Sequence, residues 1–386
     1  MTSTGAALRA DGRLVTIRRA EVTDRAALHA LDAAASDRSI RFRFFSASRE
    51  TAERYADAVA AEPQTATRDA LVAETDVGVV GLAALEQIAP DNAEIAVLIA
   101  DAVQHEGIGT LLVEALLAAA RARRLSTLCA DVLADNAGML TVLHDLGLPM
   151  TRSFEDGVLH LVLDLEGATD LSTQVTERER QSEVASLRHV LAPRSVAVVG
   201  VGSRENSIGR AVLRNLVGAG FTGDLAVVHP RHDEILGLRA VPTPAQLSES
   251  PDLAVVAVPP DQVLPVVDEL GACGTGAILL LTSGFGEAGS AGARAQRELL
   301  TIVRRHGMRL VGPNCLGVVN TDPHVRLNAT FATMPVAPGG LALASQSGAV
   351  GIAVAHAAAA RGLGLGRFVS MGNKVDVSGN DLLLAW

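Results

Sequence analysis

Between residues 10 and 165, the apolar positions switch repeatedly between the two-residue period of strands and the longer period of helices. In residues 109–123, for example, Leu111, Leu112, Leu116 and Leu117 have the spacing of an amphipathic helix. Two apolar runs flanking Thr75-Asp76 predict a hairpin. The whole pattern predicts helices at 23–35, 109–123 and 137–146, and strands at 14–18, 70–74, 77–85, 93–99, 127–133 and 158–163. We therefore expect one α/β domain over residues 10–165.

A different pattern begins after the polar, charged residues 166–188, which we interpret as an interdomain linker, helical in part. Short apolar runs separated by helical segments then recur at 195–200, 225–229, 252–258, 277–281 and 309–312. Continuously apolar strands are typical of a parallel sheet covered by helices on both faces. A further strand at 340–345 opens a third block. We expect a second domain over 189–320 and an incomplete third domain over 321–386, which favours a fragment of a longer protein.

The composition argues against several classes of protein. A net charge of −10 disfavours nucleic acid as a partner. The chain lacks the run of about eighteen uncharged apolar residues that a membrane span needs, and its N-terminus lacks the pattern of a secretory signal. Three scattered cysteines, Cys129, Cys273 and Cys315, are too few for a disulfide framework or a metal cluster. We expect a cytoplasmic protein that binds no metal, membrane or nucleic acid.

The sharpest motif is Gln104-His105-Glu106-Gly107-Ile108-Gly109, between a predicted strand and a predicted helix. A diphosphate binds to converging backbone N–H groups, which a helix N-terminus supplies together with a favourable dipole. Glycine at 107 and 109 lets the backbone approach a phosphate without an intervening Cβ atom. Taken alone, these residues could also be a turn that only caps the helix. The strand before them and the amphipathic helix after them favour a phosphate-binding loop.

The Gln-x-x-Gly-x-Gly spacing resembles motif A of the GNAT superfamily of N-acetyltransferases. The resemblance implies a GNAT fold, acetyl-CoA as cofactor, and a strand around Val97 whose backbone pairs with the pantetheine arm. It also implies a cofactor contact for Asn136, which follows the next strand. The acetyl-CoA site implied in this way consists of Val97, Leu98, Ile99, Gln104, His105, Glu106, Gly107, Ile108, Gly109, Thr110 and Asn136.

Glu94 is the candidate catalytic residue. An acceptor amine must be neutral to attack, and free lysine with a pKa of ~10.4 is almost wholly protonated at neutral pH, so a general base helps. In the protein lysine acetyltransferases that this block resembles, a glutamate at this point of Ala-Glu-x-Ala-x-x-Ile is the base, directly or through water. The alternative is a solvated glutamate at the start of a strand. Tyr55, the only tyrosine, lies well before this strand, so we expect water to protonate the leaving thiolate.

A second glycine-rich loop, Gly200-Val201-Gly202-Ser203-Arg204, also follows a predicted strand. Two features argue against NAD: Glu205 stands where a third glycine would fall, and His229-Pro230-Arg231 ends the next strand without the acid that holds a ribose. With Thr282-Ser283-Gly284-Phe285 and Gly312-Pro313-Asn314-Cys315-Leu316-Gly317, the run resembles the CoA-binding region of NDP-forming acyl-CoA synthetases, the succinyl-CoA synthetase family.

This second resemblance implies a Rossmann-like CoA-binding domain, the start of a flavodoxin-like domain, and a second site for CoA or acyl-CoA. The residues implied there are Gly200, Val201, Gly202, Ser203, Arg204, Arg231, Val258, Pro259, Thr282, Ser283 and Gly284.

Together the two halves resemble bacterial protein lysine acetyltransferases in which a GNAT domain is fused to a synthetase-like region that senses or binds acyl-CoA. This implies acetylation of a lysine on a metabolic enzyme, with an AMP-forming acyl-CoA synthetase suggested by the family. The first domain is poor in aromatic residues, which favours an open groove for a protein lysine over an enclosed site for a small amine. Two alternatives stay open: part of an acyl-CoA ligase with an accessory GNAT domain, and a non-catalytic CoA-responsive module. The sequence does not indicate the oligomeric state.

Overall fold

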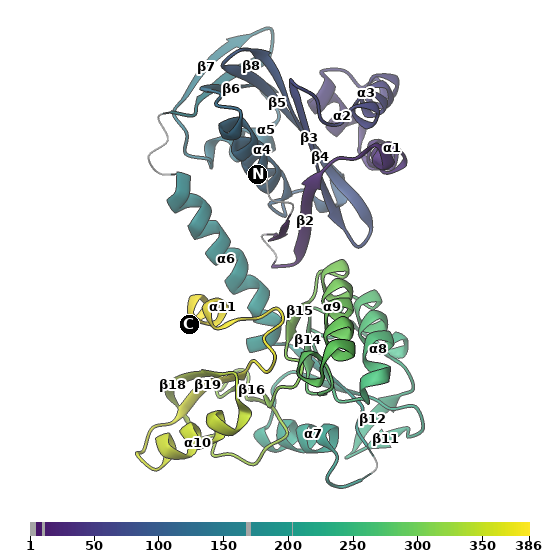
Figure 1. Ribbon diagram of the computed structural model, residues 1–386, viewed down its shortest axis with the longest axis vertical. Coiled ribbons are helices and arrows are strands. Elements are labelled where there is room, and N and C mark those ends of the chain that lie inside the picture. Colours follow the sequence, from purple (N-terminus) through teal and green to yellow (C-terminus); the bar gives the residue numbers. More distant parts are fainter. Residues whose placement is uncertain (1–4, 10–11, 167–170, 203) are drawn as a thin grey trace. The chain divides into compact units, whose positions relative to one another are not determined.

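The computed structural model describes residues 5–9, 12–166, 171–202 and 204–386 of the chain (Figure 1). They form two compact units, Met1–Ser182 and Glu183–Trp386. In the described part of the chain, no helix has the length and apolar character needed to cross a bilayer. The same residues contain no cluster of three or more His, Cys, Asp or Glu side chains that could hold a metal ion.

An eight-stranded sheet runs through the described residues of the first unit, in the order β1-β2-β3-β4-β5-β6-β8-β7. Neighbouring strands are antiparallel except β5 and β6, which are parallel. The strands are β1 (Gly5–Leu8), β2 (Leu14–Arg19), β3 (Arg68–Thr75), β4 (Gly78–Ala89), β5 (Asn92–Ile99), β6 (Thr127–Leu133), β7 (Met150–Glu155) and β8 (Val158–Asp164). The two edge strands, β1 and β7, were not predicted; β7 is exposed along almost its whole length and carries no apolar alternation that would reveal it.

Helices cover both faces of this sheet. Four consecutive residues of β3, from Ala70 to Ala73, are buried, which requires cover on either side. Helix α4 packs on β3, β4 and β5, and α1 packs on β4 and α3 (Figure 1). The helical segments are η1 (Val22–Asp24), α1 (Arg25–Ala34), α2 (Asp37–Phe44), α3 (Arg49–Ala61), η2 (Asp101–Val103), α4 (Ile108–Ala122) and α5 (Ala137–His144).

The second unit contains a seven-stranded sheet in the order β11-β12-β10-β9-β13-β14-β15, parallel except for the β11–β12 pair. From β9 the chain first adds β10 and β12 on one side of the sheet, and then β13, β14 and β15 on the other side, as in doubly wound folds. The strands are β9 (Ser195–Val199), β10 (Asp224–Val228), β11 (Glu234–Ile235), β12 (Leu238–Val241), β13 (Leu253–Val256), β14 (Ala277–Leu280) and β15 (Arg309–Val311). The helical segments are α7 (Ile208–Ala219), η3 (Pro244–Gln246), α8 (Pro260–Ala272), η4 (Gly286–Ala288) and α9 (Ser290–Arg305).

A four-stranded sheet in the order β17-β16-β19-β18 completes this unit. Its elements are β16 (Gly317–Asn320), β17 (Leu327–Thr330), β18 (Pro338–Ser345), α10 (Gly348–Ala359), β19 (Leu365–Ser370) and α11 (Gly379–Ala385). Val318, Leu327 and Val369 of this sheet join a core cluster that also holds Val198 and Val255 of the larger sheet. The two sheets therefore share a hydrophobic core, and β16, placed by sequence in the second block, pairs with the strands of the third.

Helix α6 (Leu171–Leu191) covers residues 171–188 of the expected linker and extends into the second unit. Leu187, near the end of the expected linker, is buried in the core of the second unit together with Val190 and Leu191, which lie in the expected second domain. Nearby, the buried guanidinium of Arg309 pairs with Glu183 of α6 at 2.7 Å. Residues 167–170 lie outside the described part of the chain.

Candidate functional site

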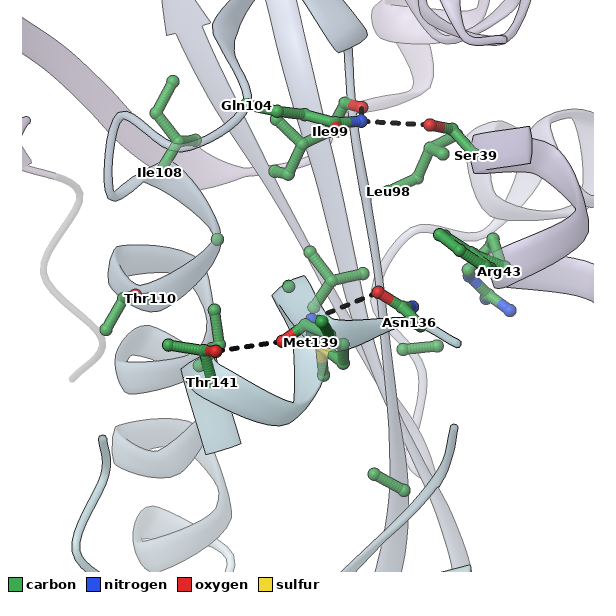
Figure 2. Close-up of a pocket in the computed structure, with 18 of the residues that line it drawn as sticks. Ser39, Arg43, Leu98, Ile99, Gln104, Ile108, Thr110, Asn136, Met139 and Thr141 are labelled. Carbon is green, nitrogen blue, oxygen red and sulfur yellow. Dashed lines mark hydrogen bonds between the residues drawn. The ribbon is translucent and has the colours of Figure 1, made fainter. Parts of the chain in front are cut away.

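A cavity of about 690 Å³ lies in the first unit between α2, β5, α4 and α5. Figure 2 shows that Gln104, Ile108 and Thr110 line it from the loop and start of α4, while Ser39 and Arg43 line it from α2. Of the residues implied for acetyl-CoA, those that line this cavity are Val97, Leu98, Ile99, Gln104, His105, Gly107, Ile108, Gly109, Thr110 and Asn136. Glu106 instead forms an ion pair with Arg9.

The loop before α4 presents unpaired backbone donors to the cavity. Gly107 is the N-cap, with a φ of 84° that favours glycine, and the first helical hydrogen bond runs from the amide of Leu111 to the carbonyl of Gly107. The amides at the start of the helix have no intrahelical partner, as at every helix N-terminus. A Cβ atom at Gly109 would stand 3.8 Å from Val142 Cγ2 and 3.9 Å from Ile99 Cγ1, both on the cavity wall. The geometry suits an anion such as a diphosphate.

Strands β5 and β6 diverge beside this loop. They pair only from Asn92 to Glu94, whereas β5 continues to pair with β4 on its other side as far as Ile99. The edge of β5 that faces β6 is therefore open from Ile95 onward, and an extended, amide-containing ligand can add to it as a strand would. The pantetheine arm of CoA has this chemistry.

Glu94 occupies the last paired position before the two strands separate. Its side chain is exposed and lines the cavity. Partial burial raises the pKa of Glu94. The negative charges of Asp131 and Glu86 raise this pKa further, whereas the positive charge of Arg43 lowers it. A carboxylate with a raised pKa at a cavity wall is suited to general-base chemistry near neutral pH.

Tyr55 does not take part in this wall. Its ring packs edge-on against Phe44 with centroids 5.7 Å apart, and its hydroxyl is buried without a hydrogen-bond partner among the described residues. Burial raises the pKa of Tyr55. Phe42 of α2 and Phe45, the C-cap residue of that helix, in contrast, line the cavity.

Asp101 and Ser39, which the sequence analysis missed, lie with Gln104 in a hydrogen-bonded cluster at the end of β5. Asp101 accepts hydrogen bonds from the backbone amide and hydroxyl of Ser36 and from the hydroxyl of Ser39. The side chain of Gln104 donates to the carbonyl of Ile99 at 3.1 Å and to Ser39 Oγ at 3.0 Å (Figure 2). Gln104 thus fastens the loop to α2. Asn136 likewise has a structural contact, since its side chain caps α5 through the amide of Met139.

In the second unit, the residues implied for CoA follow the carboxyl ends of adjacent parallel strands. Gly200 follows β9, Val258 and Pro259 follow β13, and Thr282 follows β14. Parallel strands bring these ends to one edge of the sheet, where open α/β folds bind ligands. The Thr282 hydroxyl donates to the carbonyl of Val258 at 2.7 Å, so two of these segments are in contact. Ser203 lies outside the described residues.

Three family models match successive parts of the chain. Residues 14–149 match an acetyltransferase (GNAT) domain, residues 194–321 a CoA binding domain, and residues 338–386 a succinyl-CoA ligase like flavodoxin domain. The chain joins a GNAT domain to an acyl-CoA synthetase-like region. These matches confirm the predicted α/β class and both resemblances.

The curated relatives include ADP-forming ligases. The chain is 36% identical over 197 residues to acetate–CoA ligase (ADP-forming) I of Archaeoglobus fulgidus, covering 51% of this chain and 28% of that protein. It is 38% identical over 202 residues to the alpha subunit of acetate–CoA ligase (ADP-forming) I of Pyrococcus furiosus, covering 51% and 43%. The chain therefore spans less than half of the length of either relative. A crystal structure of the GNAT domain of S. lividans PAT is 28% identical, with a TM-score of 0.37, covering 42% of this chain and 96% of that one.

Gly209 of the synthetase-like region has a packing role that the sequence did not indicate. A Cβ atom at Gly209 would stand 2.5 Å from the carbonyl oxygen of Gly200, so Gly209 lets α7 approach β9. Close approach of helix and strand is the task of the third glycine in a dinucleotide-binding loop. Here Gly209 performs it, four residues beyond Glu205.

The turn after β10 is shaped by a neutral histidine. His229 is buried, and its Nδ1 accepts hydrogen bonds from the amides of Arg231 and His232. Burial lowers the pKa of His229, and His232 and Arg231 lower it further. The imidazole nitrogen accepts the hydrogen bonds that an Asp or Asn side chain would accept in an Asx-turn. The side chain of Arg231, the second residue after His229, is exposed at the sheet edge.

Proposed function

We propose that the GNAT domain transfers the acetyl group of acetyl-CoA to a lysine ε-amine of a protein, with Glu94 as general base. The observation that best supports this is that Glu94 and the open amides before α4 line a single cavity at the divergence of β5 and β6. Bound acetyl-CoA would supply an activated thioester carbonyl. The amides of residues 107–110 would hold its diphosphate, and the open edge of β5 its pantetheine arm.

The acceptor side of the cavity suits a long aliphatic stem that ends in an amine. Phe42 and Phe45 provide apolar surface for the methylene groups, and Glu94 provides an acceptor for the proton. The amine nitrogen forms the new amide bond as the thioester C–S bond breaks. Glu94 takes the proton from nitrogen, and water protonates the thiolate, because the Tyr55 hydroxyl is buried away from the cavity.

Replacement of the base tests this assignment. Glu94→Gln keeps the shape of the side chain but cannot accept the proton, so turnover should fall by about 100-fold or more while acetyl-CoA affinity stays unchanged. Glu155→Gln, which removes an exposed carboxylate of β7, is the matched control and should behave like wild type. Steady-state rates and calorimetric titration distinguish the two effects. Near-normal turnover of Glu94→Gln would remove Glu94 from this role.

The identity of the acceptor can be tested separately. Labelled acetyl-CoA should modify a folded protein, most strongly an AMP-forming acyl-CoA synthetase, and should give poor turnover with polyamines, aminoglycosides or free amino acids. Saturable acetylation of one small amine without protein labelling would contradict the protein substrate and leave the acetyltransferase proposal intact.

We further propose that the synthetase-like region binds CoA or acyl-CoA at the carboxyl edge of its larger sheet and acts as a sensor. The similarity to ADP-forming ligases favours a second candidate, namely ligase activity. Incubation with acetyl-CoA, ADP and phosphate distinguishes them: a sensor binds acyl-CoA without turnover, whereas a ligase forms ATP, acetate and CoA.

A further inference from the structure

The charged groups that face Glu94 come from three elements. Glu86 stands directly opposite on β4, and Asp131 lies on β6, two residues beyond the position paired with Glu94. Each of these carboxylates has its own cationic or hydrogen-bonding partner. Arg68 Nε lies 2.9 Å from Glu86 Oε1, and His160 Nδ1 lies 2.7 Å from Asp131 Oδ1. Glu94 itself makes no hydrogen bond or ion pair with the described residues.

Arg43 of α2 is the third of these charged groups, and it lines the same cavity as Glu94. Its guanidinium carbon lies 4.7 Å from the ring centre of Phe44 and 4.6 Å from that of Tyr55. Two aromatic faces therefore hold the cation without neutralising it.

Arg41 pairs with Asp135 and Arg49 with Asp37. Arg38, which also lines the cavity, stacks on the ring of Phe42 at 5.1 Å. Like Arg38, Arg43 has no carboxylate within ion-pair distance in the described part of the chain. The charged or titratable groups that face Arg43 are Asp32 on α1, Tyr55 on α3 and Glu94 on β5. Its positive charge thus remains available to the cavity.

We propose that Arg43 is a positioning residue that sets the pH range of acetyl transfer, by stabilising the Glu94 carboxylate and disfavouring the ammonium form of the acceptor amine. The proposal rests on the proposed role of Glu94 as base. In a partly desolvated cavity, one fixed cation stabilises a nearby anion and destabilises a nearby second cation. Both effects act in the same direction, since transfer needs an ionised base and a neutral amine. Burial and Asp131 raise the pKa of Glu94, and Arg43 acts against them.

The pH profile of kcat/KM tests this role with the full chain, a protein acceptor and acetyl-CoA. Arg43→Gln should move the acidic limb upward by on the order of half to one pH unit. The rate should therefore fall several-fold on the acidic limb and be unchanged on the alkaline plateau. Arg43→Lys keeps the charge and should restore the limb. Arg54→Gln removes an exposed arginine of α3 and is the matched control, with an unchanged profile.

The outcomes separate this inference from the proposed function. If Glu94→Gln abolishes the acidic limb and Arg43→Gln does not shift it, Glu94 is the base and the role proposed for Arg43 is contradicted. If the limb persists in Glu94→Gln, the base assignment fails, and the inference fails with it. A loss of rate that is equal at every pH and is not restored by Arg43→Lys would show that Arg43 only supports the fold, and thermal melting of each variant checks that reading.

Discussion

Replacing Asp32 with asparagine should stabilise the GNAT domain above about pH 6. Asp32 lies on α1 with only 6% of its surface exposed, and its Oδ2 has no hydrogen-bond partner among the described residues. Burial raises the pKa of Asp32 from 3.8 to about 6, although His29, Arg43 and Arg49 favour the ionised form. A carboxylate that is buried without partners is destabilising when charged.

The magnitude follows from linkage between protonation and folding. A rise of about 2.2 pH units at about 1.36 kcal/mol per unit corresponds to about 3 kcal/mol lost once the carboxyl is ionised in both states. Because the folded-state pKa is the higher one, the folded protein binds more protons between about pH 4 and pH 6. Stability from this group is therefore present below about pH 4 and is lost as pH rises through about 6. A buried asparagine amide costs about 1 kcal/mol itself, so the expected net gain at about pH 8 is about 2 kcal/mol.

Hydrogen–deuterium exchange of α1 peptides measures this gain locally, which avoids assuming that two units unfold together. Asp32→Asn should slow exchange at about pH 8 and give no gain at about pH 4. The fluorescence of Trp386, the only tryptophan in the chain, reports on the second unit and should not change in Asp32→Asn. Glu155→Gln, an exposed carboxylate of the same unit, is the control. An Asp32→Asn protein that is equally or less protected at about pH 8, or protected to the same extent at both pH values, would refute the reasoning.

Two further predictions concern the cofactor loop and the buried arginine. Gly109→Ala should leave the fold as stable or more stable, because the added Cβ atom makes only ordinary contacts and alanine favours a helix by about 1 kcal/mol. The same variant should weaken acetyl-CoA binding, and Gly109→Val should abolish acetyl-CoA binding. Calorimetric titration measures the acetyl-CoA affinity of both variants, and Gly218→Ala, which replaces a glycine of α7, is the control. An unchanged acetyl-CoA affinity in Gly109→Val would contradict the assignment of the loop to the diphosphate. Arg309→Met leaves Glu183, Asp376 and Asp381 without their shared cation and should destabilise the second unit by about 3–5 kcal/mol. Unfolding of the second unit in urea, followed by Trp386 fluorescence, measures this loss. The control is Arg297→Met, an exposed site on α9, and a loss for Arg309→Met below about 1 kcal/mol would show that the cluster contributes little.

Much of the fold was predictable because it depends on local pattern. Strand β6 begins and ends where its apolar run does, at Thr127 and Leu133, and α4 begins within one residue of its prediction. The candidate CoA segments of the second unit were also predictable as a group, since the ends of parallel strands meet at one edge whatever their side chains. Strand β7 was missed because its exposed residues carry no periodic signal; its place in the sheet comes from pairing with β8.

The sequence by itself determined the periodic elements, the amide loop before α4 and the presence of a carboxylate in the strand preceding it. Only the tertiary structure decided what surrounds that carboxylate. Glu86 faces Glu94 through antiparallel register, Asp131 approaches it through the parallel pairing of β6, and Arg43 reaches the cavity because α2 packs along β5. The same holds for Gly209 against Gly200 and for Arg309 against Glu183. These contacts join residues far apart in the chain, and long-range register and packing are set by the burial of the whole core, which no local segment specifies.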